Sequence, residues 1–209
     1  MSAWTTERAA GGVLVASLLI GLLALAILIA SGALPVFSVS LRGSLAEMAP
    51  YAATFRRLTL LWAVAWIVQL LGLGLLTHVL LRAGDEYLAI PAFLAILVAA
   101  ILGILHGTFH MSVETWAAQE AARTGSIPEV YEPLRAWVSD SFRVAYVAHL
   151  VAMAGFGWAI VRSGVLAPWV GWAAIGWSIL WLAGYPLSIG APGILFIMPA
   201  VIGAALLWR

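Results

Sequence analysis

Three ionisable side chains follow one another at helical spacing, and together they could bind a metal ion. His106, His110 and Glu114 are four residues apart, in an apolar stretch that becomes polar towards Arg123. On an α-helix, positions i, i+4 and i+8 share one face and drift by only about 40° per step. Imidazole nitrogens and carboxylates are common ligands of divalent metals. The spacing therefore predicts a helix face that carries two histidines and a glutamate in line.

A further histidine could join this face from a neighbouring helix. His149 lies early in a later apolar stretch, and antiparallel packing would place it at a depth similar to that of His106 and His110. The candidate metal ligands are therefore His106, His110, His149 and Glu114. A b-type haem between His149 and one of the other histidines is a variant of this site. In an enzyme, Glu114 would be a ligand or a base beside a metal-bound water.

A second interpretation of these histidines is structural. A neutral histidine near a membrane face can hydrogen-bond a backbone carbonyl, a lipid headgroup or a tyrosine such as Tyr146. His78 is predicted near the opposite face and has no histidine partner there, which disfavours a two-haem quinol-oxidising subunit. Both interpretations remain open at the level of the sequence.

The helix that carries the candidate site is predicted to be longer than a membrane is thick. The apolar stretch from Leu88 continues without a helix breaker to Arg123, and Gly125 is a C-terminal stop signal. About 36 residues would extend roughly 54 Å at 1.5 Å per residue, against an apolar layer of about 30 Å. Part of this helix must therefore lie in water.

The composition places the whole chain in a bilayer. Its 209 residues are 64% hydrophobic and only 9% charged, and the mean hydropathy is +1.07, whereas soluble domains carry about 25% charged residues. The formal net charge of +1 does not provide the basic surface that nucleic-acid binding requires. The sequence contains no Cys, Lys or Asn. These absences exclude disulfides, thiolate ligands, Schiff bases and N-glycosylation, and they are compatible with a bacterial source.

Six apolar stretches predict an all-α, polytopic bundle of six transmembrane helices in a single domain, residues 1–209. The predicted spans are residues 11–34, 58–81, 88–123, 142–161, 168–187 and 192–209. The first is longer than the apolar region of about 7–15 residues in a signal peptide, so we expect a retained span.

Two loops are predicted to be longer than the others. In residues 35–57, Ser44 and Glu47 form a capping-box pattern that predicts a short interfacial helix. In the loop before the fourth span, Ser126 and Glu129 form a second capping box, and Pro133 is expected to interrupt the segment, leaving a surface-lying turn of helix up to Ser139.

The arginines give a weak signal for orientation in a bacterial plasma membrane. The side of the termini has four, Arg8, Arg82, Arg162 and Arg209. The other side has six, Arg42, Arg56, Arg57, Arg123, Arg135 and Arg143. The positive-inside rule then predicts that the longer loops are cytoplasmic and both termini extracytoplasmic.

Other residues in the spans have mainly packing interpretations. The pairs Trp62 with Trp66 and Trp177 with Trp181 form i, i+4 faces, which favour packing, with a pocket for a lipid, quinone or pigment as the alternative. Paired glycines indicate close helix packing and no strict dimer motif; they are Gly72 with Gly74, Gly155 with Gly157, and Gly171 with Gly176. Prolines in the last two spans are typical of broken transporter helices, but these spans carry no charged residue inside the membrane, so transport is a third candidate.

The segment from Arg162 to Trp172, followed by a span, Gly190-Ala-Pro192 and a final proline-containing span, resembles a family of small bacterial six-helix membrane proteins known only as a domain of unknown function. The resemblance covers the C-terminal third, on a turn followed by Pro-Trp-x-Gly-Trp. It implies six helices and an uncharacterised role. It assigns no function to the stretch that contains His106, His110 and Glu114.

These observations favour a non-enzymatic membrane protein, either an accessory or scaffold subunit of a membrane complex or a binder of an apolar ligand. The alternative is a metal- or haem-binding protein that uses the histidine set in redox or hydrolytic chemistry. The expected partners are membrane lipid, other membrane subunits or a second copy of the chain.

Overall fold

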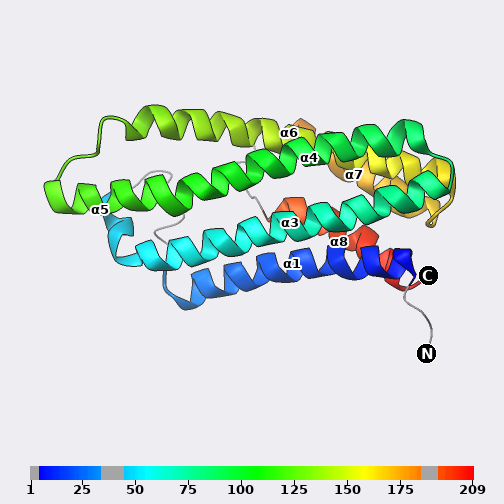
Figure 1. The fold of residues 1–209 in the computed structure, drawn as a ribbon, viewed down its shortest axis with the longest axis horizontal. Helices are drawn as coiled ribbons and strands as arrows, with labels where there is room; N and C mark the ends of the chain where they lie inside the picture. The colour runs from blue at the N-terminus through cyan, green and yellow to red at the C-terminus, as the bar shows by residue number, and fades with distance from the viewer. Residues whose placement is uncertain (1–4, 34–44, 185–192) are drawn as a thin grey trace.

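The apolar stretches of the sequence all form helices, and the described residues contain six helices and no strand (Figure 1). This computed structural model describes residues 5–33, 45–184 and 193–209. The helical elements are α1, Thr6–Ala30; η1, Leu45–Tyr51, which leads into α3, Ala52–Arg82; α4, Glu86–Phe109, continued by η2, His110–Glu114, and by α5, Thr115–Thr124; α6, Tyr131–Ser163; α7, Pro168–Gly184; and α8, Ile194–Leu207.

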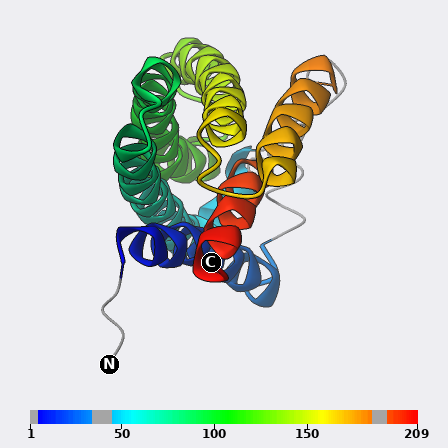
Figure 2. The ribbon, with the colours of Figure 1, turned by 90° about the vertical axis from the view of Figure 1, so that its right-hand side faces the viewer.

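The helices lie roughly along one axis, and neighbours in the sequence pack side by side. α3 packs on α1 and α4, α6 on α4 and α7, and α8 mainly on α1. Figure 2 shows α3, α4, α6 and α7 following one another around an arc, with α1 and α8 crossing beside each other. α1 begins and α8 ends at the same end of the bundle, here called the termini end (Figure 1). An even number of helices requires this arrangement.

The opposite end, here called the loop end, consists of η1, α5, residues 125–130 and the first turns of α6. It has its own small core, in which Met48, Phe55, Ala118 and Tyr131 belong to one buried cluster. A larger cluster fills the rest of the bundle and draws on α1, α3, α4, α6, α7 and α8. The molecule therefore has two separate cores along its length, a small one at the loop end and a large one in the rest of the bundle.

Four of the helical segments are long and apolar enough to cross a membrane: residues 6–30, 45–82, 86–124 and 131–163. α7 has 17 residues and α8 has 14. The predicted boundaries at Leu187 and Pro192 lie outside the described residues. Large apolar side chains are exposed on all six helices, for example Leu23, Leu71, Leu94, Val151, Leu180 and Ile197.

Pairs of glycines let two pairs of helices approach closely. A Cβ atom built on Gly157 of α6 would lie 2.6 Å from the carbonyl oxygen of Gly171 on α7, which is too close for any side chain. A Cβ atom built on Gly11 of α1 would likewise lie 2.6 Å from the carbonyl oxygen of Gly203 on α8. Gly176, in contrast, has nothing near it. The predicted role in bundle packing is therefore confirmed for Gly157 and Gly171, but Gly176 has no part in it.

Both predicted long loops contain more helix than the sequence suggested. η1 confirms the short helix after the first span, although Ser44 of its capping box lies outside the described residues. The second prediction was wrong, because α6 begins at Tyr131 and runs through Ser139 without interruption. Pro133 lies in the first turn of α6, where backbone N–H groups have no partner within the helix, so a proline is tolerated there.

Candidate functional site

The candidate residues lie where one long helix changes its winding. α4, η2 and α5 form a continuous helix from Glu86 to Thr124 that ends at Gly125, whose φ is 77°. This confirms the predicted long helix and its stop signal. The sequence did not predict that His110–Glu114 form a π-helix. Such segments are frequent at functional sites.

The π-helical turn improves the alignment of the three side chains. In an α-helix, a step of four residues overshoots a full turn by about 40°. A π-helical turn holds more residues, so the same step stops short of a full turn. The step from His106 to His110 is α-helical and the step from His110 to Glu114 is π-helical. The two deviations have opposite signs, and Glu114 therefore returns towards the line of His106.

The three side chains form a hydrogen-bonded row with a tyrosine. Nε2 of His106 lies 3.0 Å from Nε2 of His110, and Nδ1 of His110 contacts Oε2 of Glu114. The hydroxyl of Tyr131, the first residue of α6, donates to Oε1 of Glu114 at 3.1 Å. Glu114 thus joins the end of the α4 helix to the start of α6.

The positions of the protons in the row depend on the tautomers of its two histidines. An approach between two imidazole nitrogens needs one proton between them. If the Nδ1 proton of His110 faces Glu114, its Nε2 is the acceptor and His106 Nε2 is the donor. Nδ1 of His106 is then an acceptor without a hydrogen-bond partner, whereas this ring also interacts with the backbone of Val138 on α6. The order of the protons therefore depends on the tautomer of His106.

The row crosses from the protein interior to its surface. Glu114 is 5% exposed and Tyr131 is 1% exposed, whereas a third of the His110 side chain is accessible. The His106 ring stacks on Phe142 of α6, with ring centroids 4.3 Å apart. Leu105 is the last large apolar residue exposed on α4, and on α6 the exposed aliphatic side chains begin at Val144, after the exposed Trp137. The row therefore begins where the exposed aliphatic side chains of α4 and α6 end.

The structure does not bring His149 to this row. The stacking of Phe142 on His106 and the close approach of Gly155 to Ala92 set the antiparallel register of α4 and α6. In this register His149 lies opposite Ala99, seven residues or about 10 Å deeper than His106. The predicted similar depth was wrong because Phe142, the expected start of the fourth span, lies level with His106, and His149 lies two turns further along α6.

The arrangement does not resemble a metal site. Among the described residues, no three His, Asp or Glu side chains come together in a way that could hold a metal ion. His106, His110 and Glu114 contact one another in sequence, so their donor atoms do not converge on a common point. His149 lies 1% exposed beside Trp66, with ring centroids 5.8 Å apart in an edge-on contact. It does not face a second histidine from the row.

Sequence reasoning did not identify Tyr131 as a member of the row, because it was assigned to a surface turn. A second missed feature lies in the bundle interior. Pro199 of α8 has no N–H, so the carbonyl of Leu195 lacks its helical partner. Gln69 of α3, which is fully buried, donates Nε2 to this carbonyl at 2.9 Å. The spacing of Leu195 and Pro199 is the signal that could have revealed a free carbonyl.

Comparison of the chain with protein-family models, with curated proteins and with solved structures found no match. The function must therefore be inferred from the residues and their arrangement.

Proposed function

We propose that this chain is an integral membrane protein of six transmembrane helices, without catalysis of its own, that serves as an accessory or scaffold subunit in a bacterial plasma membrane. Its loop end is the part that docks a partner. The observation that carries this proposal is how far the loop end extends past the apolar exterior.

The length of the helix beyond Leu105, compared with the thickness of the headgroup layer, supports this extension of the loop end. From Leu105, the last exposed large apolar residue of α4, the helix continues for 19 residues to Thr124, or about 28 Å. A headgroup layer is only about 7 Å thick on each side of the apolar core. Roughly 20 Å of helix therefore remains for the aqueous side, and its own buried core keeps this part rigid.

The loop end also exposes apolar side chains where lipid cannot cover them. Ile127 and Val130, in the connection between α5 and α6, are 47% and 52% exposed. Trp116 and Trp137 are exposed on the flanking helices, and tryptophan is enriched among the residues that dominate protein interfaces. The hydrogen-bonded row then has a structural role, because it fixes the start of α6 to the long helix behind this surface. Its geometry gives no comparable support to metal binding, haem binding or transport.

Isolation in mild detergent tests this proposal. We expect a stoichiometric partner to copurify with the native chain and to be lost from the double variant Ile127→Asp/Val130→Asp. Ser126→Asp is the matched control, since it adds a charge to the same exposed connection without removing an apolar residue. A chain that runs alone, and whose deletion leaves every membrane complex intact, would contradict the scaffold function.

A further inference from the structure

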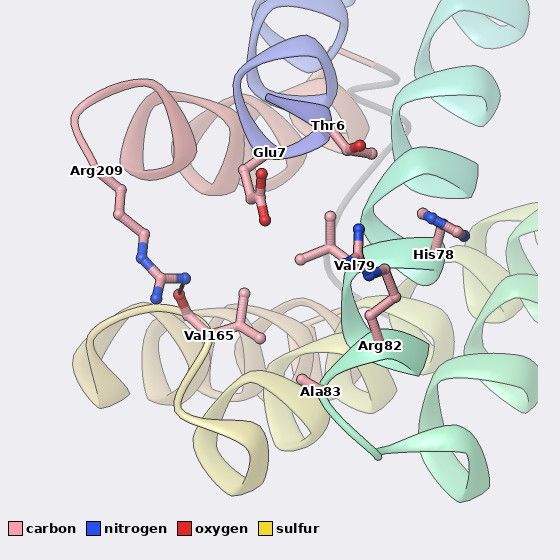
Figure 3. Close-up of a pocket in the computed structure, with 8 residues that line it drawn as sticks. All are labelled: Thr6, Glu7, His78, Val79, Arg82, Ala83, Val165 and Arg209. Carbon is pink, nitrogen blue, oxygen red and sulfur yellow. Dashed lines mark hydrogen bonds between the residues drawn. The ribbon is translucent and has the colours of Figure 1, made fainter. Parts of the chain in front are cut away.

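A charged cavity of about 300 Å³ opens at the termini end, away from the hydrogen-bonded row (Figure 3). It is lined by the charged residues Glu7 of α1, Arg82 of α3 and Arg209, and by His78 of α3. Figure 3 shows Glu7 between Arg209 and Arg82, and both arginine charges act on its carboxylate. Two permanent positive charges thus face one carboxylate, so the cavity retains an excess of positive charge.

An apolar cavity of about 520 Å³ adjoins the charged one. Both cavities are lined by Val165 and Arg209, so they meet at these two residues. The second cavity continues along Leu166, Trp169 and Trp208. The guanidinium of Arg209 donates to the carbonyl oxygen of Val165, which holds this side chain at the junction (Figure 3). A charged space that continues into an apolar one matches a molecule with an acidic head and a hydrocarbon tail.

The position of the two cavities agrees with such a ligand. Tyr87, Trp169 and Trp208 are strongly exposed near the helix ends that meet here. Exposed tyrosine and tryptophan are enriched at the level of lipid headgroups. An arginine that lines a cavity at this level can pair with the phosphate of an anionic lipid. Arg162, also at this end, has its own carboxylate, since it lies 3.7 Å from Asp85, and it does not line the cavity.

We infer that the termini end binds one anionic phospholipid, with its phosphate beside Arg82 and Arg209 and an acyl chain along the groove at Leu166 and Trp169. Glu7 is the internal anion that the phosphate must compete with. The inference rests on the proposed membrane insertion, but not on the partner at the loop end. The two experiments can therefore fail separately.

Native mass spectrometry of the detergent-purified chain tests the site. The probes are phosphatidylglycerol and phosphatidylcholine with identical acyl chains. We expect the chain to retain phosphatidylglycerol several times more strongly, and Arg82→Gln to reduce this retention about fivefold. Glu7→Gln should increase it, because the competing carboxylate is gone. Arg8→Gln is the matched control: Arg8 is exposed at the same end and does not line the cavity, so its loss should change nothing.

A second arm separates lipid from free phosphate. Trp169→Ala should weaken retention of phosphatidylglycerol, and inorganic phosphate at equal concentration should not displace the lipid. Equal retention of the two lipids, or an equal loss in the Arg8 and Arg82 variants, overturns the site. Displacement by inorganic phosphate, with no effect of Trp169→Ala, overturns the lipid as its ligand. If Arg82→Gln does not fold, the increase expected for Glu7→Gln decides the question.

Discussion

Glu114 is the residue on which the hydrogen-bonded row depends, since it accepts from both Tyr131 and His110. Replacing it with alanine leaves two polar groups at the α4–α6 junction without an acceptor. We expect Glu114→Ala to lower the free energy of unfolding by about 3 kcal/mol, and Tyr131→Phe by about 1 kcal/mol, in chemical unfolding of detergent-solubilised protein.

Glu120→Ala is the control for this prediction. Glu120 lies on the same helix and pairs with the exposed Arg123 at the protein surface, so its loss should leave unfolding unchanged. Equal effects of the Glu114 and Glu120 variants would show that the row does not hold the two helices together.

Of the individual residues in the hydrogen-bonded row, the sequence predicted only some. The spacing of His106, His110 and Glu114 was sufficient to place them on one face, because neighbours four residues apart on a helix always lie close together. Tyr131 and His149 could not be placed in the same way. Their positions depend on where α6 begins and on its register against α4, and neither is encoded in local spacing.

α8 contains a backbone carbonyl, that of Leu195, which interacts with side chains of two other helices, Gln69 of α3 and His149 of α6. Pro199 frees the carbonyl of Leu195, and Gln69 satisfies it from α3. We expect Gln69→Leu to lower the free energy of unfolding by about 1 kcal/mol in the native background. Pro199→Ala restores the missing N–H, so the same Gln69→Leu change should then cost little. A double-mutant cycle measures this coupling, and additive effects of the two changes would contradict it.

The contact between α6 and α7 gives a prediction with a control in the same helix. Gly171→Ala places a methyl group against α6 and should destabilise the protein by about 1–3 kcal/mol. Gly176→Ala, on α7 with open space around it, should be neutral or slightly stabilising because alanine favours the helix. Thermal unfolding in detergent compares the two. Similar losses for both would mean that the close approach at Gly171 does not limit packing.

The elements themselves were largely predictable, and their ends were not. Hydropathy identified six apolar stretches because lipid-facing helices must be apolar on most of their surface. The same signal missed the start of α6, since its first turns carry many polar residues and pack on the loop-end core. Pro133 was interpreted as a break because proline interrupts helix interiors, but in a first turn it removes no hydrogen bond.

For the whole molecule, the central expectation is that the long helix from Glu86 to Thr124 crosses from one aqueous side to the other. The chain contains no cysteine, so single cysteines can report on each position. Glu86, Leu94 and Gln119 are all exposed on this helix. An impermeant maleimide added to intact cells should label Glu86→Cys, and should label Gln119→Cys only after permeabilisation. Leu94→Cys should stay unlabelled in both conditions, because lipid covers it.

This experiment also tests the predicted orientation, in which both termini are extracytoplasmic. Labelling of Gln119→Cys but not Glu86→Cys in intact cells would reverse the orientation and retain the membrane span. Labelling of Leu94→Cys would contradict the span itself.

The π-helical segment has a further consequence for how this molecule can vary. Such a segment contains a surplus residue relative to an α-helix, and each residue of an α-helix turns the chain by about 100°. Deleting one residue from it, for example the exposed Ser112, would close the wide turn to an α-helical one and leave the rotation of everything beyond nearly unchanged. Ala117, Ala118 and Ala121, which α5 buries at the loop end, would then keep facing the same way. The wide turn therefore absorbs one residue, so the chain can lose a residue here while the loop end keeps its direction.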